Sequence, residues 1–247
     1  MLLAIPVFNE AGSLKEVFSE ILHHLPPQIQ AIVAIDDGST DGSAQLLDEL
    51  TETHEGIFVR HHKDNHGYGC AMIESMQIAR KHGYSHLITM DCDRQHRPAD
   101  LIRFIGMDED IDIVSGSRYL PDSRTRGNPP ADRVEINSRI TARLNRHYDW
   151  KLSDSFCGFK RYKMEGIDPD LFKETGYAFP MEFWAYSRRM ELTIEELAVS
   201  RIYTTDSRSF GEDLDRRRRR YRYYLETLKE AEERFQVPAP AAPGSIA

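Results

Sequence analysis

The sequence predicts an α/β fold in which a mostly parallel sheet is covered by helices on both faces. Short apolar runs, typical of buried strands, alternate with amphipathic helical segments over residues 2–115. Polar clusters directly follow three of these runs, at residues 8–10, 36–41 and 91–96. Because ligands of such sheets bind at the carboxyl ends of the strands, we expect the three clusters to meet in one crevice.

The first half of the chain supplies most of the predicted sheet. Residues 2–7 are continuously apolar, as expected for a strand buried on both faces. Apolar residues then recur three and four positions apart over residues 14–25, which predicts a helix with Asn9 or Ser13 as its cap and two prolines after its end. By the same criteria we expect strands at residues 31–35, 57–60, 86–90 and 111–115, and helices at residues 43–50, 69–81 and 101–105.

The pattern changes after residue 120. Residues 121–133 are rich in Pro, Gly, Asp and Arg, which predicts a long loop that is either a functional lid or disordered. Helices are expected at residues 133–148 and 215–235, and the segments 153–162, 177–190 and 197–203 mix turn, helix and strand signals. The tail at residues 236–247 is rich in Pro and Ala and is expected to be disordered.

The composition favours a globular protein that does not bind nucleic acid. The 247 residues carry a net charge of -8, whereas nucleic-acid-binding domains are usually strongly basic. Three scattered cysteines suggest neither disulfides nor a zinc site, which favours a cytoplasmic location. The apolar start is interpreted as a strand rather than a signal peptide, and no stretch approaches the roughly 18 apolar residues of a membrane span.

Six arginines form a basic run near the C-terminus of this acidic chain, at residues 216–220 and 222. The run is either a solvated helix face or a contact for an anionic partner. Together with Tyr221, Tyr223 and Tyr224, it is also suited to contact the anionic inner face of a membrane. A membrane contact of this kind is peripheral.

Asp91 and Asp93 are the first candidates for chemistry because they flank one residue at the end of a predicted strand. Paired carboxylates, with Gln95 as a neutral oxygen ligand, suit Mg²⁺ or Mn²⁺, whose remaining ligands are typically phosphate oxygens and water. A divalent cation there stabilises the charge that grows on a departing diphosphate. An isolated acidic pair is more often a cap or a solvated turn, so its context decides the interpretation.

The segment at residues 36–43, Asp-Asp-Gly-Ser-Thr-Asp-Gly-Ser, is a candidate nucleoside site. Its carboxylates are able to accept hydrogen bonds from a base N–H or a ribose hydroxyl, and its glycines permit close approach of the backbone to a ligand. The alternatives are a turn that starts a helix and a fragment of a calcium loop. The calcium alternative fails because no Glu completes the spacing of a twelve-residue loop.

Five motifs occur in order over half of the chain: AIPVFNE at residues 4–10, IDDGSTDG at 35–42, NHGYGCA at 65–71, MDCDRQH at 90–96 and GSRY at 116–119. This ordered set resembles family 2 glycosyltransferases, and in particular the dolichyl (polyprenyl) phosphate mannose synthase group. The resemblance implies a GT-A fold with a Rossmann-like sheet, a GDP- or UDP-sugar donor, Mg²⁺ or Mn²⁺, and transfer with inversion at the anomeric carbon.

The resemblance also implies roles for individual residues. It places Asp91 and Asp93 in the motif that binds the metal and the diphosphate, with Gln95 as a third metal ligand. It assigns the nucleotide to Pro6, Phe8, Glu10, Asp36, Asp37, Cys92 and Arg118. It divides the chain into a nucleotide-sugar-binding half at residues 1–120 and an acceptor-side half of the same catalytic domain at residues 121–235.

On the acceptor side, the resemblance implies that Arg133, Arg208 and Ser209 bind an acceptor phosphate. A polyprenyl phosphate acceptor is already ionised and needs positioning rather than deprotonation. A sugar hydroxyl acceptor instead needs a general base, for which Asp154 and Glu182 are the candidates, although Glu182 is equally suited to cap a helix. The group's Ser before the glycine of the Asp-x-x-Ser-Gly-Phe segment is Cys157 here.

Other functions stay open at this point. A catalytically silent nucleotide-sugar-binding protein would share the family motifs without turnover. A nucleotidyltransferase also uses paired carboxylates, but it is expected to carry a basic, glycine-rich loop after the first strand, where this chain has Pro6, Phe8 and Glu10. A Lys typical of the synthase group is Tyr68 here. The chain lacks a Gln-x-x-Arg-Trp segment and a membrane-spanning tail, which favours a single-transfer enzyme over a processive synthase.

Overall fold

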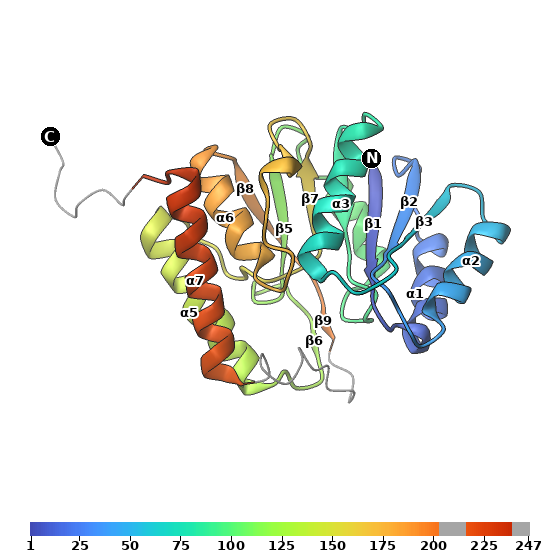
Figure 1. Ribbon diagram of the computed structural model, residues 1–247, viewed down its shortest axis with the longest axis horizontal. Helices are drawn as coiled ribbons and strands as arrows, with labels where there is room; N and C mark the ends of the chain where they lie inside the picture. Colours follow the sequence, from blue (N-terminus) through green and yellow to red (C-terminus); the bar gives the residue numbers. More distant parts are fainter. Residues whose placement is uncertain (203–215, 239–247) are drawn as a thin grey trace, which may run out of the picture.

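The computed structural model describes residues 1–202 and 216–238. Arg208, Ser209 and the last nine residues of the predicted tail lie outside these ranges. A seven-stranded sheet runs through the centre of the molecule, with helices on both faces (Figure 1). The prediction of an α/β fold with a mostly parallel sheet is confirmed.

The strands of the central sheet follow the order β3-β2-β1-β4-β7-β5-β8. The first four are parallel to one another, β7 is antiparallel to both of its neighbours, and β5 and β8 are parallel to each other. The strands are β1 (Leu2–Val7), β2 (Ala31–Asp36), β3 (Ile57–His61), β4 (His86–Thr89), β5 (Ile113–Ser117), β7 (Lys160–Lys163) and β8 (Ile194–Ala198). A small second sheet joins β6 (Thr125–Arg126) to β9 (Arg201–Ile202).

The helices divide between the two faces because alternate strand residues point to opposite sides. Leu3 and Ile5 of β1 lie in one core cluster with α1 (Ala11–His23), α2 (Ser43–Thr53) and α4 (Leu101–Ile105). Leu2 and Ala4 lie in the other cluster, with α3 (Tyr68–Lys81), α5 (Ala131–Tyr148), α6 (Phe179–Arg189) and α7 (Arg217–Phe235). Each face therefore has its own hydrophobic core.

Several boundaries differ from the sequence prediction. The α1 helix starts at Ala11, and its N-cap is Glu10 without a side-chain bond, so neither Asn9 nor Ser13 is the cap. Asn9 instead adopts a left-handed backbone with φ 55°, and its Oδ1 accepts from the amide of Thr40 at 2.7 Å. The expected loop at residues 121–133 is interrupted by β6 and by the start of α5. Over the described ranges, none of the helices is both long and apolar enough to cross a membrane.

Candidate active site

The turns after β1 and β2 are bonded to each other. The amide of Glu10 donates to Ser43 Oγ at 2.8 Å, and the amide of Ala11 donates to Asp41 Oδ2 at 2.9 Å. These bonds join the starts of α1 and α2, so two of the three predicted polar clusters meet at the carboxyl ends of adjacent parallel strands. This is where the sequence places a nucleoside.

Asp36 and Asp37 are buried and accept hydrogen bonds from protein groups. Asp36 Oδ1 accepts from the Ser39 amide at 3.1 Å, and its Oδ2 lies 2.8 Å from Nδ1 of His61. Asp37 accepts from the amides of His66 and Gly67, at 2.9 and 2.7 Å, at the start of α3. Asp37 therefore stabilises the N-terminus of α3, while Asp36 keeps acceptor capacity for a ligand.

His61 and His62, which the sequence analysis did not assign, support these two carboxylates. His62 Nδ1 lies 2.7 Å from Asp37 Oδ1, and its Nε2 lies 2.6 Å from Glu74 Oε2. Burial alone would lower the pKa of His62, but its hydrogen bonds to Asp37 and Glu74 outweigh burial and raise the pKa. The signal for this role was the position of the histidines at the end of β3, beside β2.

The remaining predicted nucleoside residues differ in exposure. Phe8 is 42% exposed directly after β1, an unusual state for a large aromatic ring and a suitable surface for stacking a base. Pro6 is half-buried on β1. Glu10 is buried, and its carboxylate accepts from Ser13 Oγ at 2.6 Å. Of the three residues, Phe8 presents the largest apolar surface to a ligand.

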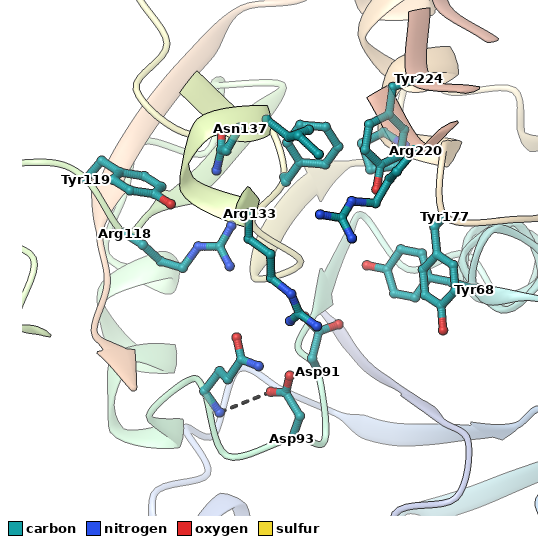
Figure 2. A pocket seen from close by; sticks show the side chains of 14 residues that line it. Tyr68, Asp91, Asp93, Arg118, Tyr119, Arg133, Asn137, Tyr177, Arg220 and Tyr224 are labelled. Carbon is teal, nitrogen blue, oxygen red and sulfur yellow. Dashed lines mark hydrogen bonds between the residues drawn. The ribbon is translucent and has the colours of Figure 1, made fainter. Parts of the chain in front are cut away.

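A cavity of about 200 Å³ is lined in part by Asp91 and Asp93 (Figure 2). Its walls come from elements that are far apart in the sequence. The lining residues are Tyr68, Asp91, Asp93, Gln95, Arg118, Tyr119, Arg133, Ile136, Asn137, Phe156, Tyr177, Pro180, Arg220 and Tyr224. Carboxylates thus line one part of a cavity whose other walls carry arginines and aromatic rings.

Asp91, Asp93 and Gln95 lie together at the end of β4. The amide of Gln95 donates to Asp93 Oδ1 at 3.0 Å, and the Gln95 carbonyl accepts from the amide of Ile202 at 3.3 Å. Burial and the negative charge of Asp91 raise the pKa of Asp93 to about 6. A cation bound beside Asp93 would offset these effects and stabilise its ionised carboxylate.

Gly158 makes room for the Asp91 carboxylate. A Cβ atom at position 158 would lie 2.4 Å from Asp91 Oδ2 and 2.6 Å from its Oδ1. The carbonyl of Gly158 accepts from Thr89 Oγ1 at 2.7 Å, which fixes the glycine against the end of β4. The site therefore requires a residue without a side chain at position 158.

The donor set of this turn fits a divalent cation only in part. Within residues 1–202 and 216–238, no three or more His, Cys, Asp or Glu side chains are grouped to hold a metal ion. Asp91 and Asp93 with the Gln95 amide supply three oxygen groups, and Mg²⁺ and Mn²⁺ sites of this kind leave the other positions to phosphate and water. The residues suit a metal that binds together with a diphosphate.

Asp154 does not line the cavity. Its carboxylate is fully buried and holds Arg118 in a bidentate pair, with Nε 2.7 Å from Oδ2 and Nη2 3.0 Å from Oδ1. Asn137 Nδ2 also donates to Oδ1 at 2.7 Å. Burial alone would raise the pKa of Asp154, but Arg118 and Asn137 hold the pKa well below its usual range. This geometry suits a residue that positions Arg118.

Glu182, the other candidate base, also lies outside the cavity lining. It is buried in the first turn of α6 and accepts from the amides of Lys173 and Glu174, both at 2.9 Å, and from Arg234. Cys92 and Cys157 are buried in the hydrophobic core cluster that also contains residues of α1. Burial raises the pKa of each thiol to about 12. Only the backbone of Cys92 is therefore available to a nucleotide at this turn.

Arg133 and several aromatic residues complete the cavity. Figure 2 shows the Arg133 side chain extending from α5 toward Asp91 and Asp93. Tyr68 and Tyr177 stack with their ring centroids 6.3 Å apart. The sequence analysis left the run that contains Arg220 as either a solvated helix face or a contact for an anionic partner. Arg220 and Tyr224 both line this cavity and are buried, because α7 packs against α5 and α6.

The fold and the carboxylates at the end of β4 define an α/β enzyme of the GT-A type. The model of the family described as "Glycosyl transferase family 2" matches residues 3–168, so the chain belongs to this family and is a glycosyltransferase. The predicted resemblance is confirmed.

Curated relatives include polyprenyl-phosphate sugar synthases. The chain is 31% identical over 186 residues to the polyprenol monophosphomannose synthase of Mycolicibacterium smegmatis, which covers 73% of this chain and 69% of that protein. It is 26% identical over 208 residues to the undecaprenyl-phosphate mannosyltransferase of Micrococcus luteus, which covers 81% of this chain and 82% of the relative.

Solved structures support the fold. The glucosyl-3-phosphoglycerate synthase of Mycobacterium tuberculosis, crystallised with Mn²⁺, UDP and glucosyl-3-phosphoglycerate, aligns with a TM-score of 0.68 at 18% identity. The alignment covers 96% of this chain and 80% of that one. At this identity the likeness shows the GT-A fold.

Proposed function

We propose that the protein transfers a sugar from GDP- or UDP-sugar to the phosphate of a polyprenyl phosphate, with Mg²⁺ or Mn²⁺ and with inversion at the anomeric carbon. The observation that carries the proposal is the cavity in which Asp91, Asp93 and Gln95 face Arg133. Its carboxylate side suits a metal-bound diphosphate, and its arginine side suits a second anionic group. The names of the two mannosyl-transferring relatives support the same acceptor.

In the proposed reaction, an ionised phosphate oxygen of the acceptor attacks the anomeric carbon. The bond from that carbon to the donor diphosphate breaks, and the nucleoside diphosphate leaves with the electron pair. Asp91, Asp93 and Gln95 would hold a divalent cation, which would neutralise charge on the departing diphosphate. Arg133 positions the acceptor phosphate, and Phe8 and Asp36 hold the nucleoside.

This reaction needs no general base, which agrees with the surroundings of Asp154 and Glu182. Both carboxylates are buried and bonded to protein donors outside the cavity lining. Transfer to a sugar hydroxyl would need a base that touches the acceptor. We therefore favour a phosphate acceptor over a hydroxyl acceptor. We also favour it over a catalytically silent nucleotide-sugar-binding protein, which would not need the arginines that line the cavity.

We place the enzyme on the cytoplasmic face of a membrane. Arg216, Arg218, Arg219 and Arg222 are exposed on and next to α7, the helix that also borders the cavity. An exposed basic helix face of this kind binds anionic lipid head groups. A lipid acceptor would then reach the cavity from the membrane surface.

The test combines binding and turnover. Purified protein is mixed with GDP- and UDP-sugars, farnesyl phosphate, and Mn²⁺ or EDTA. We expect nucleotide with Mn²⁺ to raise the Tm by roughly 5–10 °C at 100 times its Kd, and labelled sugar to reach farnesyl phosphate only with metal. The Asp91→Asn/Asp93→Asn variant should lose both effects, whereas the matched Asp122→Asn variant, which changes an exposed carboxylate outside the cavity, should keep them. Equal transfer in EDTA would contradict the proposal.

A further inference from the structure

Three guanidinium groups from distant parts of the chain line the same cavity. Arg118 follows β5, Arg133 comes from α5, and Arg220 comes from α7. Arg118 is held by both carboxylate oxygens of Asp154, so its charge is compensated inside the protein. Arg133 and Arg220 are the guanidinium groups that the helices α5 and α7 contribute to the cavity.

Arg220 is placed there by an ion pair at the start of α5. Its Nη2 lies 2.5 Å from Asp132 Oδ2, and the residue is only 3% exposed. Figure 2 shows its guanidinium directed toward the side of the cavity on which Arg133 lies. A buried arginine is costly without a partner, and the Asp132 carboxylate orients the Arg220 guanidinium while the residue still lines the cavity.

The same helix fixes the aromatic wall beside Arg220. Tyr224, one turn further along α7, packs on Phe156 with ring centroids 4.8 Å apart. Tyr223 bonds to Glu174, and a Cβ at Gly176 would lie 2.5 Å from the Tyr223 hydroxyl, so α7 contacts the segment that carries Tyr177. Apart from Phe156, the residues of these α7 contacts follow residue 168, where the family match ends.

We infer that α7 is the acceptor-recognition element of this enzyme, and that Arg220 binds the acceptor phosphate together with Arg133. The inference rests on the proposed function and adds to it a specificity-determining residue that lies outside the family motifs. The chemistry recognised is a phosphate monoester beside an apolar group, because Arg220 lies between the charged side of the cavity and the rings of Tyr177 and Tyr224.

The experiment measures binding and transfer separately in the full chain. Arg220→Gln is compared with wild type for the Kd of farnesyl phosphate, by calorimetry, and for the KM of farnesyl phosphate in transfer. We expect both constants to rise by about tenfold or more, the effect of one lost charge-assisted hydrogen bond, while the Kd of nucleotide with Mn²⁺ stays unchanged. The Kd and KM of Arg220→Lys should lie between those of the wild type and of Arg220→Gln, because lysine keeps the positive charge.

Two further proteins control for damage to the fold. Asp132→Asn/Arg220→Gln neutralises both partners, leaves no unpaired buried charge, and should weaken farnesyl phosphate binding as much as Arg220→Gln does. Arg143→Gln removes an exposed arginine of α5 outside the cavity and should bind like wild type.

Binding measurements with three different ligands distinguish the possible sources of the phosphate group. If Arg220→Gln weakens the binding of farnesyl phosphate but not of glycerol 3-phosphate, Arg220 recognises a lipid phosphate. If it weakens the binding of both ligands equally, Arg220 recognises a phosphate group from either source. Farnesol, which has no phosphate, should not respond to the substitution. Equal farnesyl phosphate affinity in wild type and Arg220→Gln overturns the inference. Loss of binding in Arg220→Gln without any transfer by wild type overturns the proposed function alone.

Discussion

Gly158 is the residue at which the smallest chemical change should disturb the carboxylate turn. In Gly158→Ala, the added methyl group would lie 2.4 Å from Asp91 Oδ2, so the Asp91 side chain has to move. We expect the Mn²⁺-dependent rise of Tm with nucleotide to be lost, with a loss of about 1–3 kcal/mol in the free energy of unfolding from overpacking. Thermal shift and urea unfolding measure the two effects.

Gly12→Ala is the matched control for this substitution. Gly12 lies in α1, and a Cβ there meets nothing within 4 Å. This change should stabilise the protein by about 0.5–1 kcal/mol and leave metal dependence intact. If Gly158→Ala keeps the Mn²⁺ effect of the wild type, Asp91 does not hold the metal.

His62 should make stability depend on pH. Its pKa is raised in the folded protein by Asp37 and Glu74, so the folded state binds the proton more tightly than the unfolded state does. The stabilisation is fully present below the unfolded pKa of about 6.5 and is lost as the pH rises through the raised, folded pKa. His62→Gln should therefore flatten the fall of unfolding free energy with increasing pH.

Urea unfolding at a series of pH values from 5.5 to 8.5 measures this slope. His54→Gln, which removes an exposed imidazole from the end of α2, should leave the slope close to that of the wild type. A steeper slope in His62→Gln would show that the carboxylates of Asp37 and Glu74 do not bind the protonated ring.

At the scale of elements, Asp154 connects the end of β5 to α5. Its partners are Arg118, which follows β5, and Asn137 on α5. Asp154→Asn leaves the half-buried Arg118 guanidinium without its carboxylate, so we expect a loss of about 3 kcal/mol in unfolding free energy. Urea unfolding checks this value, and adding Arg118→Met should recover part of the loss.

Kinetics distinguish a positioning role of Asp154 from a general base. If Asp154 positions Arg118, transfer to farnesyl phosphate should fall in Asp154→Asn without a change in the pH profile of kcat. If Asp154 is instead a general base, its substitution should remove the limb of that profile at acidic pH. Loss of that limb would return Asp154 to the role of base that the sequence suggested.

The elements of the first half could be predicted from sequence because periodicity and strand-end motifs are local signals. The strands at residues 2–7 and 57–60 and the helix at 69–81 agree with β1, β3 and α3 to within about two residues. The order of the sheet could not be predicted in the same way. The sequence of Lys160–Lys163 contains no local signal that predicts the antiparallel position of β7 between β4 and β5.

The sequence analysis named Asp91, Asp93, Gln95, Arg118 and Arg133, which all line the cavity, but it did not single out Arg220. Asp91, Asp93 and Gln95 lie in one short segment with a recognisable motif, so they were found together. Arg220 lies in a run of arginines in which position alone does not tell buried from exposed side chains. Only the packing of α7 on α5 and α6 sends one arginine of the run into the cavity.

At the scale of the whole molecule, the exposed arginines of α7 should control membrane binding. Arg218→Gln/Arg222→Gln removes two exposed positive charges, each worth about 1 kcal/mol at an anionic surface. We expect about a tenfold or greater loss of affinity for phosphatidylserine vesicles in flotation assays, and little change with neutral phosphatidylcholine vesicles.

The control removes the same charge elsewhere on the molecule. Lys15→Gln/Lys81→Gln changes exposed residues of α1 and α3. This variant should bind phosphatidylserine vesicles like the wild type. An equal loss in both variants would mean that overall charge, rather than the face of α7, sets vesicle binding.

The place of β7 in the sheet has a consequence for how the chain folds during synthesis. Strands β1, β2, β3 and β4 have partners among themselves, but both partners of β5, namely β7 and β8, lie later in the chain and are therefore synthesised later. Residues 113–117 must therefore wait for residues 160–163 before they join the sheet. We therefore expect a fragment that stops at residue 120 to keep the nucleotide motifs but to lack the strands that pair with β5 and hold Arg118 in place.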